Sequence, residues 1–141
     1  MPRPKCFLDS AYAIALSAPK DEFHERATIL AENIEAESAH LITTRAVILE
    51  IGDALSSSGN RKAAIKLLTS LENDPNFVEI VPISEELYRR GFQLYRTRPD
   101  KEWGITDCIS FIVMQDRGIT EALTTDKHFQ QAGFRALLRE V

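Results

Sequence analysis

Residues 106–129, TDCISFIVMQDRGITEALTTDKHF, contain a helix–strand–helix unit that decides the fold. Residues 107–118 are apolar on nearly every side, which is typical of a helix buried inside a domain. Gly118 ends this pattern, residues 121–124 form a short strand-like run, and a second helical pattern follows. A strand placed between two helices indicates a parallel sheet that is covered by helices.

The same alternation runs along the whole chain. The predicted strands are residues 5–8, 40–43, 77–82 and 121–124, with a weaker one at 134–138. The predicted helices are residues 10–16, 21–38, 45–58, 61–73, 85–97, 107–118 and 127–132. Strands that alternate with helices predict a three-layer α/β/α sandwich with a central parallel sheet of four to five strands.

Composition is that of an ordinary globular protein. The 141 residues suit one domain, spanning 1–141, and 44% hydrophobic with 27% charged residues argues against disorder. A net charge of −4 excludes a polybasic nucleic-acid binder. We find no membrane span or signal peptide, and Cys6 and Cys108 fit buried reduced thiols, so we expect a cytoplasmic protein.

Four carboxylates lie where chemistry is expected in such a fold. Asp9 follows the first predicted strand, Asp126 follows the fourth, Asp107 opens helix 107–118, and Glu50 lies inside helix 45–58. Ligands of open parallel sheets bind at the carboxyl ends of the strands. Taken singly, each of the three aspartates also fits an ordinary role at a helix N-terminus, where acids are favoured.

Glu50 is harder to explain as a surface residue. Its helix is largely apolar, and the neighbours three and four positions away supply no cation, while Asp53 repels it. A half-buried carboxylate must find a partner or raise its pKa. A salt bridge to a distant lysine or arginine is the structural alternative.

Taken together, the four carboxylates favour a metal site over helix capping. Three of them meet at one edge of a parallel sheet, and a cluster of acids repels itself unless a cation lies among them. Oxygen ligands without cysteine or histidine suit Mg²⁺ or Mn²⁺ rather than zinc. Ser10 and Thr125, beside Asp9 and Asp126, could add hydroxyl ligands or hold ordered waters.

Three segments of the chain resemble the PIN domain family, and within it the VapC-type ribonuclease toxins. Residues 7–16, FLDSAYAIAL, are similar to the opening strand with its aspartate. Residues 43–55, TTRAVILEIGDAL, are similar to the second motif with its helical glutamate. Residues 103–134 are the most specific part, in which a helix-opening aspartate is followed by a strand and T-x-D-x-x-F.

This resemblance implies a function as well as a fold. Asp9, Glu50, Asp107 and Asp126 would form an acidic quartet around one or two Mg²⁺ or Mn²⁺ ions. The chain would be a metal-dependent endoribonuclease that hydrolyses phosphodiester bonds in structured RNA, as the toxin of a type II toxin–antitoxin pair. The resemblance further implies a homodimer and a small antitoxin partner. The acidic stretch between Asp9 and the second strand is long, so the lid over the site is expected to differ.

RNA binding requires positive charge, and residues 87–103 supply much of it. The candidate contacts are Arg96, Arg98 and Lys101, in the segment before Asp107, with Lys127 and His128 beside Asp126. Aromatic residues interleaved with the arginines could stack unpaired bases; these are Tyr88, Phe92, Tyr95 and Trp103. We favour the simpler interpretation, an amphipathic helix whose aromatic residues face the core. Lys127 and His128 fit ordinary surface residues equally well.

Other classes of α/β protein fit less well. A haloacid dehalogenase-type phosphatase requires a second aspartate two residues after Asp9, where Ala11 stands. A receiver domain requires an acid at the tip of the middle strand, where the sequence reads VPIS. The phosphate-binding motifs G-x-x-x-x-G-K-[ST] and G-x-G-x-x-G are absent. The remaining alternative is a catalytically silent PIN-like module that binds RNA or protein without needing a metal.

Overall fold

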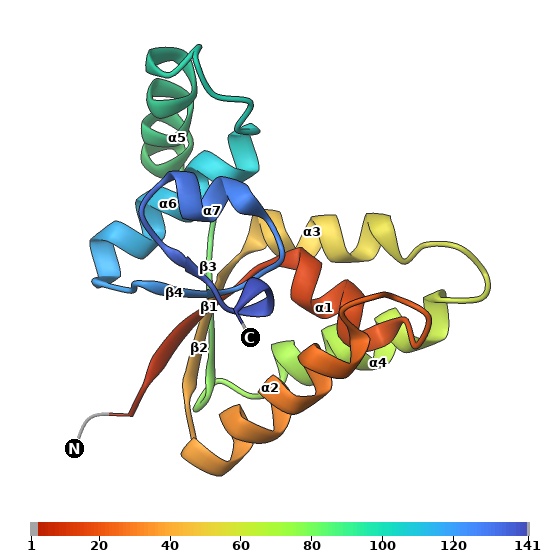
Figure 1. Cartoon of the computed structure of the whole chain (residues 1–141). Helices are drawn as coiled ribbons and strands as arrows, with labels where there is room; N and C mark the ends of the chain where they lie inside the picture. Colours follow the sequence, from red (N-terminus) through yellow and green to blue (C-terminus); the bar gives the residue numbers. More distant parts are fainter. Residues whose placement is uncertain (1–2, 141) are drawn as a thin grey trace.

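The computed structural model describes residues 3–140 and contains a five-stranded parallel sheet (Figure 1). The strands are β1 (Lys5–Leu8), β2 (His40–Thr44), β3 (Val78–Val81), β4 (Glu121–Leu123) and β5 (Arg135–Ala136). Their order across the sheet is β3-β2-β1-β4-β5, so β1 lies at the centre between β2 and β4. The predicted α/β sandwich with a parallel sheet is confirmed.

The helices cover the sheet in two layers (Figure 1). One layer holds α1 (Ser10–Ser17), α2 (His24–Glu37), α3 (Arg45–Ala54) and α4 (Arg61–Glu72); the other holds α5 (Glu85–Thr97), α6 (Ile105–Arg117) and α7 (Lys127–Gln131). A short 3₁₀ helix, η1 (Leu137–Arg139), follows β5. The chain reverses its progress across the sheet after β3, which places the switch point beside β1. Ligands of parallel sheets bind outside such a point.

An aromatic cluster fixes α6 and α7 against the sheet. Phe111 of α6 meets Phe129 of α7 edge to face, with ring centroids 5.0 Å apart. Phe129 also packs on Phe7 of β1, at 6.2 Å, and Trp103 packs against Phe111 at 5.1 Å. All four side chains are buried. Because Asp107 and Asp126 lie at the amino ends of these two helices, the cluster also holds their carboxylates in place.

Helix α5 packs on α6 through a narrow stripe that requires a glycine. A Cβ atom at Gly91 would lie 2.6 Å from Cγ1 of Ile109. The opposite side of α5 is open, and Tyr88, Phe92 and Tyr95 there are 47%, 40% and 45% exposed. Their rings stack along the helix with centroids 6.3 Å apart. The prediction that these three aromatic residues face the core is therefore wrong, because only the glycine-bearing stripe contacts the domain.

Trp103, the fourth aromatic residue of this segment, does face the core as predicted, because its side chain is buried. Its indole Nε1 donates a hydrogen bond to Oε1 of Gln131, at 3.0 Å. This bond joins the segment before α6 to the end of α7.

Two helix starts differ from the prediction. Helix α2 begins at His24 rather than at residue 21, because the Asp21 side chain accepts a hydrogen bond from the backbone N–H of Phe23 and closes a turn. Helix α6 begins earlier than predicted, with Gly104 at the N-cap position, so Asp107 is the third helical residue. Its carboxylate accepts a hydrogen bond from the Gly104 N–H at 3.2 Å.

Two other elements are shorter than predicted. Helix α3 ends at Ala54 instead of residue 58. The weak strand predicted at 134–138 pairs only over Arg135–Ala136 and then turns into η1. Both differences lie at element ends, where local pattern is least informative.

Serine and glycine residues stand at the ends of several elements, and Gly118 ends α6 as predicted. The Ser84 hydroxyl accepts a hydrogen bond from the Leu87 N–H at 3.0 Å and caps α5. Gly118 and Gly133 have φ angles of +64° and +95°, the left-handed region that favours glycine.

Cys6 and Cys108 are buried free thiols, and burial raises the pKa of each to about 11. Within residues 3–140, no helix has the length and apolar character needed to span a bilayer.

Candidate metal centre

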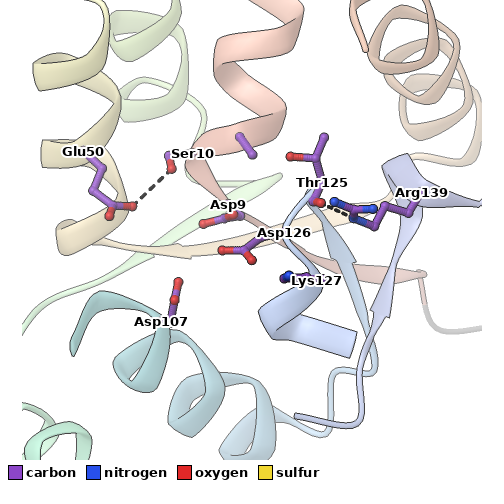
Figure 2. Close-up of a pocket in the computed structure, with 9 residues that line it drawn as sticks. Asp9, Ser10, Glu50, Asp107, Thr125, Asp126, Lys127 and Arg139 are labelled. Atoms are coloured by element: carbon purple, nitrogen blue, oxygen red, sulfur yellow. Dashed lines mark hydrogen bonds between the residues drawn. The ribbon is translucent and has the colours of Figure 1, made fainter. Parts of the chain in front are cut away.

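An acidic pocket of about 430 Å³ opens at the carboxyl edge of the sheet, beside the switch point (Figure 2). The residues that line it are Asp9, Ser10, Ala11, Glu50, Asp107, Thr125, Asp126, Lys127 and Arg139. They come from the ends of β1 and β4 and from α1, α3, α6, α7 and η1. The fold thus brings together four carboxylates that are far apart in the sequence.

Asp9 is the most buried of the four, with 5% of its surface exposed. It occupies the N-cap position of α1, but its side chain makes no capping hydrogen bond. Instead, its Oδ2 accepts a hydrogen bond from the Thr124 hydroxyl at 2.7 Å. Burial raises the pKa of Asp9 to about 7, and the charges of Asp107 and Glu50 push it in the same direction. Helix capping does not explain this residue.

Glu50 reaches the pocket from α3. Its carboxylate accepts a hydrogen bond from the Ser10 hydroxyl at 3.1 Å. Burial raises the pKa of Glu50 despite that hydrogen bond, and the charges of Asp107 and Asp126 raise it further. No lysine or arginine within residues 3–140 forms an ion pair with it, so the alternative of a distant salt bridge does not hold.

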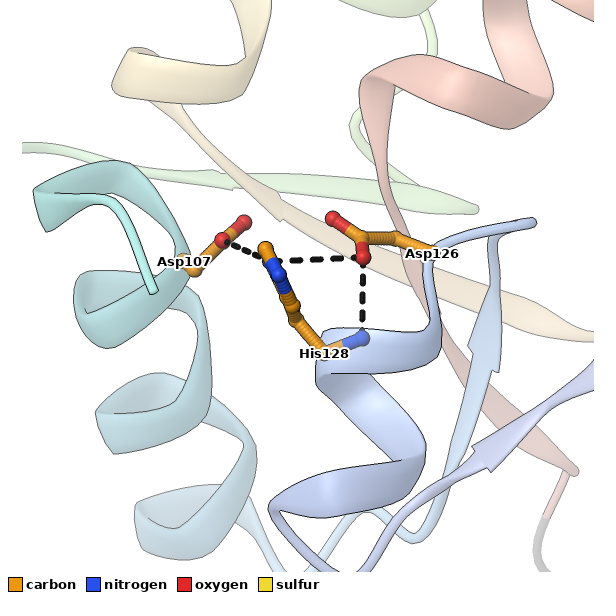
Figure 3. A group of neighbouring side chains, drawn as sticks. All are labelled: Asp107, Asp126 and His128. Atoms are coloured by element: carbon orange, nitrogen blue, oxygen red, sulfur yellow. Dashed lines mark hydrogen bonds and ion pairs between the residues drawn. The ribbon is translucent and has the colours of Figure 1, made fainter. Parts of the chain in front are cut away.

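Asp107 and Asp126 face each other across the imidazole of His128 (Figure 3). Nδ1 of His128 lies 3.0 Å from Oδ2 of Asp107 and 3.3 Å from Oδ1 of Asp126. Asp126 also caps α7, because its Oδ1 accepts a hydrogen bond from the backbone N–H of His128 at 2.8 Å. Burial raises the pKa of Asp107, while its contact with His128 opposes that rise. Both aspartates therefore serve a helix terminus and line the pocket.

The predicted basic residues separate into two groups. Lys127 lines the pocket, together with the predicted hydroxyl residues Ser10 and Thr125. Arg96, Arg98 and Lys101 do not line it. The Arg98 guanidinium pairs with Asp100 at 3.0 Å and lies over the ring of Trp103, 5.2 Å from its centroid. Arg96 donates a hydrogen bond to Gln93.

Two residues were missing from the site predicted from the sequence: Thr124, which lies behind the pocket and supports Asp9, and Arg139, which lines the pocket. Thr124 is fully buried, and its hydroxyl donates to Asp9 while accepting from the backbone N–H of Asp126 at 3.0 Å. Period-two alternation could have found it, because Thr124 and Asp126 are two residues apart at a strand end. Arg139, which donates to the carbonyl of Thr125, comes from a 3₁₀ turn that no local pattern revealed.

The chemistry of these side chains fits a hard divalent cation. Four carboxylates converge, burial raises the pKa of three of them, and no lysine or arginine within residues 3–140 forms an ion pair with any of the four. Asp107, Asp126 and His128 each offer one ligand atom, and these three atoms lie within 4.8 Å of one another. Carboxylate oxygens are the ligands that Mg²⁺ and Mn²⁺ prefer.

Comparisons with known proteins identify the family of the chain and a similar fold. The sequence matches the PIN domain family over residues 6–135, and the chain belongs to that family. The fold is similar to the crystal structure of Mycobacterium tuberculosis VapC20, described as a toxin that cleaves the sarcin-ricin loop. The TM-score is 0.79 at 22% identity, over 92% of this chain and 95% of that one. A search of curated proteins gave no match.

Proposed function

We propose that this chain is a metal-dependent endoribonuclease and the toxin of a type II toxin–antitoxin pair. The observation that carries the proposal is the convergence of Asp9, Glu50, Asp107 and Asp126 on one pocket at the carboxyl edge of the sheet. Membership of the PIN domain family and the likeness of the fold to a ribonuclease toxin add support.

Asp9 and Asp107 are proposed as principal ligands of Mg²⁺ or Mn²⁺. When bound, such an ion lowers the pKa of a coordinated water and stabilises charge on the phosphodiester. The buried position of Asp9, with Thr124 donating to Oδ2, fixes the direction of its carboxylate. Glu50, held by Ser10, is proposed as a ligand or as the base that orients the attacking water. Asp126 is proposed as a ligand of a second ion or as a ligand through water.

RNA is the proposed substrate, and positive side chains beside the acids would hold its phosphates. Lys127 and Arg139 line the pocket and could contact the phosphates on either side of the bond that is cleaved. Arg96, Arg98 and Lys101 lie outside the pocket, and we propose them as contacts for more distant phosphates. A structured RNA is favoured because VapC20, to which the fold is similar, is described as cleaving the sarcin-ricin loop.

The proposal extends to partners and location. We infer a homodimer in the cytoplasm that is neutralised by a small antitoxin. These inferences rest on membership of the PIN domain family and on the likeness to a toxin structure.

A map of new RNA 5′ ends in cells, made after a brief pulse of expression, tests the proposed function. We would compare the wild-type chain with Asp107→Asn and with Asp116→Asn. Both aspartates lie on α6, but Asp116 is exposed and paired with Arg90 at 2.6 Å, so it is a matched control outside the pocket. We expect new ends at a few sites with the wild type and Asp116→Asn, and their absence with Asp107→Asn.

Identical RNA profiles from all three folded proteins would contradict the proposal. In that case the chain would be better explained as a silent PIN-like module that binds RNA or protein. Such a module would bind its RNA equally well with and without Mg²⁺ or Mn²⁺.

A further inference from the structure

The imidazole of His128 occupies a position between two of the acids. Its side chain is 21% exposed, and Nδ1 faces Asp107 of α6 and Asp126 just before α7. Within residues 3–140, the ring makes no hydrogen bond to any other group. One nitrogen atom is therefore aimed at two carboxylates from different elements (Figure 3).

The distances match those between neighbouring ligands of one ion. In an octahedral site with bonds of about 2.1 Å, adjacent ligand atoms lie about 3.0 Å apart. Nδ1 of His128 is 3.0 Å from the Asp107 oxygen and 3.3 Å from the Asp126 oxygen. Each carboxylate retains a second oxygen that does not contact the imidazole. An ion could thus meet all three side chains without a large rearrangement.

The position of the ring is fixed by its own helix. The backbone N–H of His128 donates to Oδ1 of Asp126 at 2.8 Å. The next residue, Phe129, is fully buried between Phe7 and Phe111. Because the backbone is held on both sides and Nδ1 contacts both carboxylates, the imidazole is held between Asp107 and Asp126. Preorganisation of this kind is what a metal ligand requires.

We propose that Nδ1 of His128 is a metal ligand beside Asp107 and Asp126, and that it makes the site favour Mn²⁺ over Mg²⁺. The inference rests on the proposed function, since it names a further ligand of the same site. Imidazole nitrogen binds transition-metal ions well, whereas Mg²⁺ takes oxygen ligands and keeps its waters. Coordination requires the neutral tautomer that carries its one ring hydrogen on Nε2. The proton on Nδ1 is therefore released to solvent as the ion binds, and a ring that lacked a hydrogen on Nε2 takes one up from solvent.

Mn²⁺ binding measured by electron paramagnetic resonance tests this inference without any cleavage assay. The full chain would be titrated with Mn²⁺ and then with competing Mg²⁺, as wild type, His128→Ala, Asp107→Asn and His40→Ala. His40 begins β2 at the opposite edge of the sheet and serves as the control imidazole. We expect His128→Ala to weaken Mn²⁺ binding by about tenfold or more, because losing a ligand costs at least as much as losing a group that only supports one, while Mg²⁺ binding changes little.

Pulsed measurements on the bound Mn²⁺ distinguish coordination from mere support. We expect a nitrogen hyperfine coupling in the wild type and in His40→Ala, and its loss in His128→Ala. The inference would be overturned if His128→Ala bound Mn²⁺ more weakly but the Mn²⁺ bound to the wild type showed no nitrogen coupling. His128 would then only position the two aspartates.

The remaining outcomes separate this inference from the proposed function. If the wild type binds Mn²⁺ and Asp107→Asn does not, while His128→Ala behaves like the wild type, only the role of His128 is overturned. If the wild type binds neither Mn²⁺ nor Mg²⁺, the metal-dependent function fails, and the inference fails with it.

Discussion

The carboxylates on the outer surface differ from those in the pocket in their charge partners and in the direction in which their pKa values are shifted. Seven acids outside the pocket are each paired with an arginine, as in Glu79 with Arg117 and Asp116 with Arg90. These two pairs lower the pKa of the acids. In the pocket, Asp9 and Glu50 have no cationic partner within residues 3–140, and burial raises their pKa values.

The difference shows that buried carboxylates without a cationic partner are concentrated in the pocket. Within residues 3–140, the arginines form ion pairs only with acids outside the pocket. Concentrating unpaired acids at one edge costs stability, and a bound cation would recover it. A bound cation would therefore explain the unpaired pocket acids, whereas the paired outer acids are balanced by their arginine partners.

The largest contrast between the two sets is expected in catalysis. We expect Asp9→Asn to lower the rate of RNA cleavage by at least about 1000-fold, because a metal ion supplies several kcal/mol of transition-state stabilisation. The rate constant for cleavage of a labelled RNA by the purified protein measures this loss. Asp116→Asn, which changes an outer acid, should cleave at the wild-type rate. Equal rates for both variants would remove Asp9 from the catalytic machinery.

The next contrast is in the pH dependence of stability. With its pKa near 7 when folded, Asp9 keeps a proton that the unfolded chain has already released above about pH 4. The folded state therefore binds more protons, and the free energy of unfolding falls as the pH rises through this range. For the EDTA-treated protein we expect a loss of about 2–3 kcal/mol between about pH 4 and about pH 7.

Denaturant unfolding of wild type and Asp9→Asn across this range makes the measurement. The decrease in the free energy of unfolding over this pH range should be smaller in Asp9→Asn, because asparagine does not ionise. The lowered pKa values of the outer acids act in the other direction and at lower pH, because they add stability above their unfolded pKa. A wild-type stability that rises steadily from about pH 4 to about pH 7 would contradict the high pKa of Asp9.

A smaller effect is expected when the support of Asp9 is removed. Thr124→Val keeps the shape of the side chain but leaves the buried Asp9 carboxylate and the Asp126 N–H without a partner. We expect the free energy of unfolding to fall by about 1–3 kcal/mol, the usual cost of an unsatisfied buried group. Thr125→Val is the matched control, since the Thr125 side chain is half-buried and makes no side-chain hydrogen bond within residues 3–140. Similar losses in both variants would mean that Thr124 has no special role.

The smallest effect is expected for an outer pair. Asp116→Asn removes the ion pair with Arg90, in which both side chains are more than two-fifths exposed. Exposed ion pairs contribute little to stability, so the Tm should stay close to that of the wild type. A large drop in Tm for Asp116→Asn would show that the outer acids carry stability as well as charge balance.

Much of the acidic edge could be predicted from the sequence because it depends on topology. In a parallel sheet, residues that follow the strands meet at one edge, so Asp9 and Asp126 had to lie near each other. Glu50 and Asp107 could be added because their helices are apolar and offer them no local cation. Thr124 could have been found from its position two residues before Asp126 at a strand end, whereas Arg139 depends on how a 3₁₀ turn packs, which no local pattern contains.

The exposed aromatic residues of α5, in contrast, could not be predicted from the sequence. An alternation of arginines and aromatic residues predicts an amphipathic helix but does not say which side packs on the domain. Here the contact with α6 uses the narrow stripe at Gly91, and Tyr88, Phe92 and Tyr95 are left outside. Only the tertiary arrangement of the two helices decides this.

Restoring a metal to the stripped protein tests the central claim most directly. The purified wild type would be treated with EDTA, freed of chelator, and assayed for RNA cleavage while Mn²⁺ or Mg²⁺ is added back. We expect no cleavage without the ion, full recovery when it returns, and no recovery in Asp107→Asn, whereas Asp116→Asn should recover like the wild type. Cleavage that continues in excess EDTA, or that recovers equally in Asp107→Asn, would contradict a metal site built from the four pocket acids.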